Sequence, residues 1–226
     1  MHYSNIIEGI FLSRPNRFLA QVEIGGREET VHVKNTGRCR ELLIPGTKVL
    51  LTKSANPARK TAYDLVSVYK GDRLVNMDSQ APNEMAAEWV KGGGFISGIT
   101  AVKREKVFGN SRFDLYIEAG ERRIFMEVKG VTLEENGVAR FPDAPTERGV
   151  RHVEELADCV KAGYEACLFF VVQMKGVTFL EPNWRTHPAF GEALRYAASR
   201  EVRIMAYDCQ VFPGTVEIDR PVPVKI

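Results

Sequence analysis

Residues 111–117 read Ser-Arg-Phe-Asp-Leu-Tyr-Ile, and residues 124–129 read Ile-Phe-Met-Glu-Val-Lys. Both are short runs of apolar and aromatic residues typical of β-strands, and each carries charged side chains inside it. A charged side chain in a buried strand costs free energy unless it is paired or binds a metal ion. Asp114, Glu127 and Lys129 therefore indicate a functional site built on two neighbouring strands.

The spacing of these charges is typical of metal-dependent nucleases. Glu127 and Lys129 are two positions apart, so their side chains leave the same face of a strand. Two carboxylates on adjacent strands supply part of the oxygen shell that Mg²⁺ or Mn²⁺ prefers and leave room for water and phosphate. Lys129 would orient the attacking water or offset charge on the transition state. A preceding helix offers Glu84 or Glu88 to complete the shell.

The same residues also have a purely structural interpretation. Asp114 can be an acid on an edge strand, and Glu127 with Lys129 can be a solvated ion pair on one face. Glu-X-Lys is a short motif that arises by chance, so these residues alone leave both interpretations open.

The rest of the second half alternates helix and strand signals. A helix predicted from about residue 146 to 162 has an apolar stripe at helical spacing, and Pro188 begins a second amphipathic helix. Residues 166–172 form a continuous apolar run, typical of a central strand covered on both faces. This order predicts an α/β domain with a mixed sheet.

The first 80 residues consist instead of six short β-rich runs broken by turn signals, with a Gly-Gly pair at 25–26 that predicts a tight hairpin. Short strands with regular turns and almost no helix favour a small closed barrel. The length fits a five-stranded barrel of the oligonucleotide-binding (OB) type.

The pattern changes at Ala81-Pro82-Asn83, where we predict a domain boundary. Asn83 is expected to cap a helix over residues 84–91. The predicted domains are a barrel at 1–81 and an α/β domain at 82–226.

Positive charge is concentrated in the first half of the chain. Residues 1–81 hold 12 Lys and Arg against 8 Asp and Glu, whereas the remainder holds 19 against 21. This imbalance is consistent with a polyanion-binding surface beside a carboxylate site, although a difference of this size also arises by chance. The basic side chains predicted to contact nucleic-acid phosphates are Arg17, Lys34, Arg38, Arg40, Arg148 and Arg151.

Each group of basic residues has a structural alternative. The loop at 34–40 can be a turn with exposed arginines. The segment at 146–152 can be a helix start, with Thr146 as its cap and a Glu147–Arg151 pair one turn apart.

The composition disfavours several other classes of protein. The apolar runs are far shorter than the roughly 20 residues that cross a bilayer, and the first residues lack a signal-peptide pattern. The four cysteines are scattered without a Cys-X-X-Cys pair, which argues against zinc and favours reduced thiols. We therefore predict a cytoplasmic protein without a membrane segment.

Six blocks of sequence carry a family resemblance. They are Asn-Thr-Gly-Arg at 35–38 with Pro-Gly at 45–46; Pro-Asn at 82–83 ahead of Glu88; Ser-Arg-Phe-Asp at 111–114; Glu-Val-Lys-Gly-Val-Thr-Leu at 127–133; Phe-Pro-Asp-Ala-Pro-Thr-Glu-Arg-Gly at 141–149; and His152 with Glu-Leu at 155–156. On these blocks the chain resembles the sugar fermentation stimulation protein A family, nearly from end to end. Departures at Lys34, where Pro is usual, and at Gly130, where Ser is frequent, remove no proposed ligand.

The resemblance implies an N-terminal OB-type barrel and a C-terminal domain similar to the PD-(D/E)XK nucleases. It also implies DNA binding linked to the regulation of sugar, notably maltose, metabolism. By position, Asp114, Glu127 and Lys129 match the nuclease-like core, and Glu88 fits its helical acid better than Glu84.

The sequence therefore predicts a DNA-binding protein whose second domain hydrolyses phosphodiester bonds with Mg²⁺ or Mn²⁺. Asp114 and Glu127 are expected to bind the metal, Lys129 to assist the water, and Glu88 to complete the shell. One alternative is a catalytically inert, DNA-binding transcriptional regulator that keeps a relic of the site. Another is an enzyme or adaptor acting on a partner other than nucleic acid.

Overall fold

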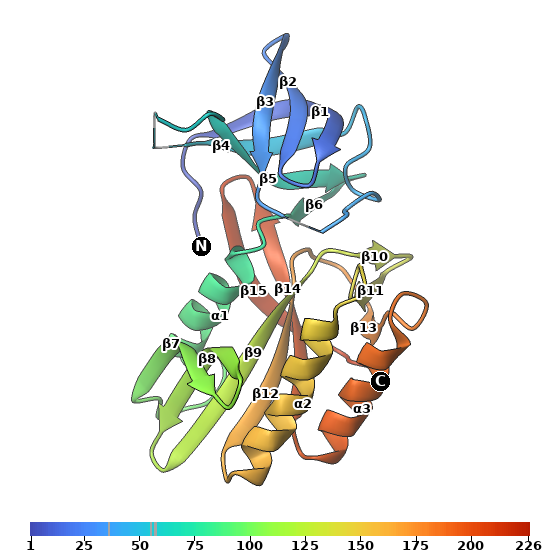
Figure 1. The fold of residues 1–226 in the computed structure, drawn as a ribbon. Helices are drawn as coiled ribbons and strands as arrows, with labels where there is room; N and C mark the ends of the chain where they lie inside the picture. The colour runs from blue at the N-terminus through green and yellow to red at the C-terminus, as the bar shows by residue number, and fades with distance from the viewer. Residues whose placement is uncertain (36, 55, 57) are drawn as a thin grey trace.

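The structure is a computed structural model that describes residues 1–35, 37–54, 56 and 58–226. Thr36, part of the motif at 35–38, lies outside the described residues. Figure 1 shows a small barrel at one end of the molecule and a larger layered part beneath it.

The N-terminal part is a closed β-barrel. Its sheet contains β1 (Ile6–Asn16), β2 (Leu19–Ile24), β3 (Arg27–Val33), β4 (Lys48–Lys53), β5 (Tyr63–Lys70) and β6 (Arg73–Asn76). The order is β3-β2-β1-β4-β5-β6, and a parallel pairing of β3 with β5 closes the first five strands into a barrel. Gly25 and Gly26 take positive φ angles in the tight β2–β3 turn. The predicted OB-type barrel is confirmed.

The C-terminal part is a six-stranded mixed sheet with helices on both faces. Its elements are α1 (Ala81–Lys91), β7 (Ala101–Phe108), β8 (Ser111–Ala119), β9 (Arg122–Val131), β10 (Glu134–Glu135), β11 (Val138–Phe141), α2 (Glu147–Lys161), β12 (Glu165–Val172), β13 (Phe179–Pro182), α3 (Pro188–Ser199), β14 (Arg203–Phe212) and β15 (Thr215–Val222). The strand order is β15-β14-β12-β9-β8-β7, with β9, β12 and β14 parallel in the centre. The predicted mixed sheet is confirmed.

Strand β12 is covered on both sides, as its apolar run predicts. Leu168 and Phe170 pack in the cluster that contains the buried residues of α2 and α3. Phe169 and Val171 pack in the cluster that contains those of α1. Figure 1 shows α2 and α3 on one face of the sheet and α1 on the other.

The helix starts agree only partly with the sequence prediction. Thr146 caps α2, because its hydroxyl accepts the Gly149 N–H at 3.0 Å. Helix α1 begins earlier than predicted, after Gln80, and Asn83 does not cap it. The Asn83 side chain instead donates to Asp114 of β8 at 2.7 Å. The small sheet β10-β11-β13 and strand β15 were not predicted.

Buried polar contacts hold the barrel against the sheet. The Gln173 amide donates to Asn76 Oδ1 at 2.7 Å and to the Asp78 carbonyl at 3.0 Å. Buried Glu134 accepts from Lys70 of the barrel at 2.6 Å. Because these groups are removed from water, their pairing fixes how the two parts meet.

No helix of the described chain is long and apolar enough to cross a membrane. All four cysteines are among the described residues; each is buried and none pairs with another.

Candidate active site

Strands β8 and β9 bring Asp114 and Glu127 to the same end of the sheet. The antiparallel ladder runs from Ala119 opposite Arg122 to Leu115 opposite Met126, and continuing this register would place Asp114 opposite Glu127. The pairing ends there because β8 rotates: Phe113 packs in the α2 cluster, whereas Leu115 packs in the α1 cluster. In a regular strand, Phe113 and Leu115 would share one face, because they are two positions apart.

Asp114 is fixed by two donors. Its Oδ2 accepts the main-chain N–H of Val128 at 2.8 Å, and its Oδ1 accepts from the Asn83 amide at 2.7 Å. Burial, together with the nearby Glu127 charge, raises the pKa of Asp114 from 3.8 to about 6. The carboxylate is thus held in place yet short of positive charge.

Glu127 is buried beside two basic side chains. Its Oε1 accepts from Lys129 Nζ at 2.6 Å and meets His152 Nδ1 at 2.5 Å. Burial alone would raise the pKa of Glu127, but the hydrogen bond from His152 and the Lys129 charge outweigh it and lower the pKa. Its other oxygen, Oε2, is buried without a hydrogen-bond partner among the described residues. An anionic oxygen with open lone pairs therefore faces this site.

Helix α2 supplies the side chains that hold Glu127 in place. Arg148 Nε donates to His152 Nε2 at 3.3 Å, so the free proton of a neutral His152 lies on Nδ1, where it meets Glu127. Arg148 was predicted to contact phosphate, and His152 was not predicted as a partner of Glu127. A histidine one turn after an arginine, on the border of an apolar stripe, was the available signal.

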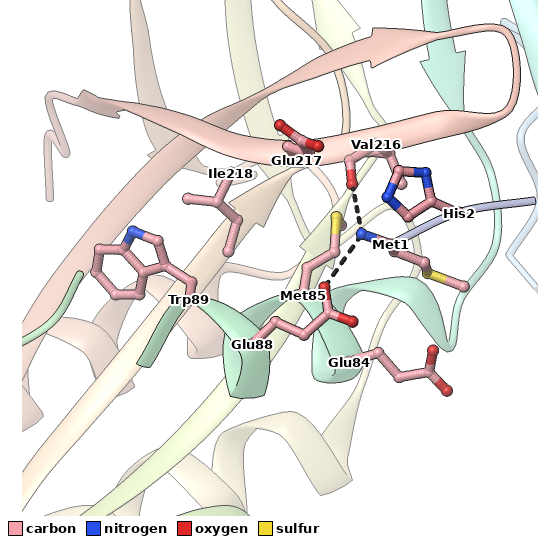
Figure 2. A pocket seen from close by; sticks show the side chains of 9 residues that line it. All are labelled: Met1, His2, Glu84, Met85, Glu88, Trp89, Val216, Glu217 and Ile218. Atoms are coloured by element: carbon pink, nitrogen blue, oxygen red, sulfur yellow. Dashed lines mark hydrogen bonds and ion pairs between the residues drawn. The ribbon is translucent and has the colours of Figure 1, made fainter. Parts of the chain in front are cut away.

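The structure does not bring Glu88 to this pair. Its carboxylate is 64% exposed and accepts from the Met1 amino group at 3.1 Å. Figure 2 shows Glu84 and Glu88, one turn apart on α1, in a pocket of about 660 Å³ that α1 shares with the N-terminus and β15. On this helix it is Asn83 that reaches Asp114. No three His, Cys, Asp or Glu side chains of the described chain gather as a metal site.

Lys34 has a structural partner. Its ammonium lies 2.6 Å from Asp78, whose side chain is fully buried. A buried carboxylate needs such a partner, so the Lys34 charge is largely consumed within the protein.

The other predicted basic residues are exposed. Arg17, Arg38 and Arg40 surround a pocket of about 390 Å³ on the barrel, here called the arginine pocket. Arg148 and Arg151 lie exposed on α2. The predicted Glu147–Arg151 pair is not formed; Glu147 pairs with His187 at 3.2 Å instead.

A second pocket lies where the barrel meets the sheet. This interdomain pocket of about 310 Å³ is lined by Asn35 and Gly37 from the barrel and by Gly130, Asp143 and Gln173 from the C-terminal part. Gly130 directly follows Lys129 in β9, although Asp114, Glu127 and Lys129 themselves do not line this pocket. The arginine pocket and the interdomain pocket share Gly37 in their linings.

Two family models divide the chain at the same place as the fold. A model described as the SfsA N-terminal OB domain matches residues 12–77, and one described as the sugar fermentation stimulation protein RE domain matches residues 80–215. The chain belongs to the sugar fermentation stimulation protein family. The RE, or restriction endonuclease-like, model covers the strands that carry Asp114, Glu127 and Lys129.

Relatives in this family match over the full length. The sugar fermentation stimulation protein homologue of Ruminiclostridium cellulolyticum is 57% identical over 100% of both chains. That of Desulfitobacterium hafniense is 58% identical over 100% of this chain and 99% of its own. The solved structure of Pyrococcus furiosus SfsA in complex with Ca²⁺ has a TM-score of 0.91 and 30% identity, covering 100% of this chain and 98% of that one.

Proposed function

We propose that this member of the sugar fermentation stimulation protein family hydrolyses phosphodiester bonds of DNA, using a divalent cation held by Asp114 and Glu127. The observation that carries the proposal is the buried carboxylate pair beside Lys129, with one Glu127 oxygen left without a partner. The inert regulator remains the alternative, and the test below separates the two.

The two carboxylates fit a divalent cation chemically. Glu127 Oε2 is a buried, ionised oxygen that lacks a donor, and the pKa of Asp114 is raised to about 6 by burial and by the Glu127 charge. A bound cation would give Glu127 Oε2 a partner and would favour the ionised form of Asp114. Mg²⁺ is commonly bound by one or two protein carboxylates together with waters and substrate phosphates. The Ca²⁺ complex of Pyrococcus furiosus SfsA supports a hard, oxygen-binding cation in this family.

When bound, such a cation lowers the pKa of water and polarises a phosphoryl oxygen. The chain's own residues would supply the rest. Asn83 and the Val128 N–H keep Asp114 in one orientation, and His152 does the same for Glu127. Lys129 is 16% exposed and so reaches solvent, where its ammonium can donate to a phosphate oxygen or orient the attacking water.

The basic face of the barrel supports a polyanionic substrate. Arg17, Arg38 and Arg40 are exposed, and a DNA backbone would displace counter-ions from them. Arg148 and Arg151 add charge on the helix beside the carboxylates. Lys34 is left out of this proposal because it neutralises Asp78.

Cleavage of labelled DNA and RNA, single- and double-stranded, tests the proposal in Mg²⁺, Mn²⁺ and EDTA. The informative variants are Asp114→Asn and Lys129→Met. The matched controls are Glu118→Gln and Lys103→Met. Glu118 lies four residues after Asp114 on β8, and Lys103 is its ion-pair partner at 3.0 Å. We expect metal-dependent DNA cleavage that Asp114→Asn abolishes, that Lys129→Met slows by about 10²–10³-fold, and that both controls retain. Binding without cleavage in every condition would contradict hydrolysis and favour the regulator.

A further inference from the structure

An exposed arginine–aromatic stack lies on the turn between β1 and β2. The Arg17 guanidinium carbon is 4.8 Å from the centroid of the Phe18 ring, and Phe18 is 45% exposed. Asn16 Oδ1 accepts the N–H groups of Phe18 and Leu19, at 2.8 and 3.1 Å. These hydrogen bonds hold the turn in one conformation, and the turn presents part of an aromatic ring to solvent.

Arg14 ties this turn to the neighbouring loop. Its guanidinium donates to the Arg17 carbonyl and to the main-chain carbonyls of Asn35, Gly37 and Arg38, at distances from 2.6 to 2.9 Å. The charge of Arg14 is thus used internally. The exposed guanidinium groups of Arg17, Arg38 and Arg40 make no ion pair with any described residue, so their charge is available to an external anion.

The arginine pocket adjoins the interdomain pocket. Gly37 lines both the arginine pocket and the interdomain pocket, and the latter continues to Gly130, next to Lys129. Asp143 Oδ2 accepts the Arg38 N–H at 3.2 Å, which anchors the basic loop to the C-terminal part. A chain of anionic groups lying on the arginines would be guided toward Lys129.

The chemistry of this path selects an unpaired strand over a duplex. A base offers its flat face to an aromatic ring only when it is unstacked from its neighbours, and proteins bind single strands with basic grooves and aromatic platforms. The turn between the first two strands is also one of the loops with which OB barrels bind oligonucleotides. The interdomain pocket, at about 310 Å³, has the size of a small-ligand site.

We propose that the substrate reaches the carboxylate site as a single strand, with one base stacked on the Arg17–Phe18 pair and its phosphates on Arg38 and Arg40. The inference rests on the proposed hydrolysis for its biological meaning. It identifies the substrate class as single-stranded DNA, or a single-stranded segment of a longer DNA. Phe18 then becomes a binding residue that the charge pattern alone does not indicate.

Fluorescence anisotropy tests this with a labelled DNA oligonucleotide, either free or annealed to its complement, in EDTA so that nothing is cut. The variants are Phe18→Leu and Arg38→Gln. Matched controls are Tyr196→Leu and Arg200→Gln, an equivalent stack at 5.4 Å on α3. That stack lies at the C-terminal end of α3, just before β14 begins and so at the sheet end opposite Lys129.

The wild-type protein should bind the single strand more tightly than the duplex. Phe18→Leu should weaken single-strand binding about tenfold, and Arg38→Gln should lower the slope of log K against log salt by about 0.7. The controls should change neither quantity. Equal or tighter duplex binding by the wild type, or single-strand affinity that is unchanged in Phe18→Leu, would overturn the inference.

The outcome is independent of hydrolysis. If Phe18→Leu loses single-strand affinity but no DNA is cut in Mg²⁺, the proposed hydrolysis fails and the strand assignment stands. If DNA is cut but duplex and single strand bind equally, the strand assignment fails and hydrolysis stands. Tight binding of an acidic peptide in place of DNA would overturn both.

Discussion

Replacing Asp114 by Asn should stabilise the metal-free protein. Burial and the neighbouring Glu127 charge raise the pKa of Asp114 from 3.8 to about 6, so the folded state disfavours its ionised form. Asn has the same shape without the charge. Its carbonyl can accept from the Val128 N–H, and its amide can donate to Asn83 once that side chain turns its own oxygen inward.

The sign and size follow from proton linkage. Because the folded pKa lies above the unfolded one, the stabilising contribution of Asp114 is complete below pH 3.8 and is lost as pH rises through 6. Each unit of pKa difference corresponds to about 1.4 kcal/mol, so ionised Asp114 costs about 3 kcal/mol at pH 8. Asp114→Asn should recover up to this amount, and the gain should vanish toward pH 4.

Denaturation by urea in EDTA, followed by tryptophan fluorescence, provides the assay. Both tryptophans, Trp89 and Trp184, lie in the C-terminal part and therefore report on the domain that holds the site. Glu118→Gln, further along the same strand, is the control and should change little. A less stable Asp114→Asn at pH 8, or a difference between variant and wild type that does not depend on pH, would refute the reasoning.

Three further predictions concern the rest of the molecule. Glu134→Gln should lower stability by on the order of 2 kcal/mol at pH 7. Burial would raise the pKa of Glu134, but the hydrogen bond from the Lys70 ammonium lowers it. The stabilising contribution of Glu134 is therefore present above its ordinary pKa of 4.5 and is lost as acid protonates the group. Urea denaturation from pH 7 to pH 3 checks this, and an equal acid sensitivity of variant and wild type would contradict it. Gln173→Leu leaves the buried Asn76 Oδ1 without its donor and should cost about 1–3 kcal/mol, seen as a lower Tm; an unchanged Tm would refute it. Glu88→Gln should leave metal-dependent cleavage unchanged, because Glu88 does not reach the carboxylate pair. Loss of cleavage in this variant would show that Glu88 belongs to the site.

Much of the fold could be predicted from local pattern. Alternating apolar residues and turn glycines in the first half specify short strands, and a continuous apolar run specifies a central one, as β12 shows. Glu127 and Lys129 could be placed on one face because they are two positions apart in a strand, and Asp114 could be placed near them because the preceding strand carries it. These inferences need only the geometry of strands and the cost of burying charge.

Contacts between distant segments could not be predicted this way. Whether Asn83 or Glu88 faces Asp114 depends on how α1 packs on the sheet, and the apolar faces of the helix settle that only once it is docked. The partner of Lys34 is Asp78, and three strands, β4 to β6, separate the two residues along the chain. His152 meets Glu127 only because α2 packs on β9. The predicted boundary at 81 and 82 and the assigned site roles stay predictions.

The measurement that tests the central claim most directly is cleavage of a labelled single-stranded DNA by the wild type and by Lys129→Met, with Mg²⁺ titrated against EDTA. Lys129→Met keeps both carboxylates, so it should still bind the cation while losing about 10²–10³-fold in rate. Wild-type cleavage that needs Mg²⁺, falls by this factor in Lys129→Met and survives in Lys103→Met is the predicted result. Cleavage that persists in EDTA, or that Lys129→Met leaves unchanged, would contradict the account.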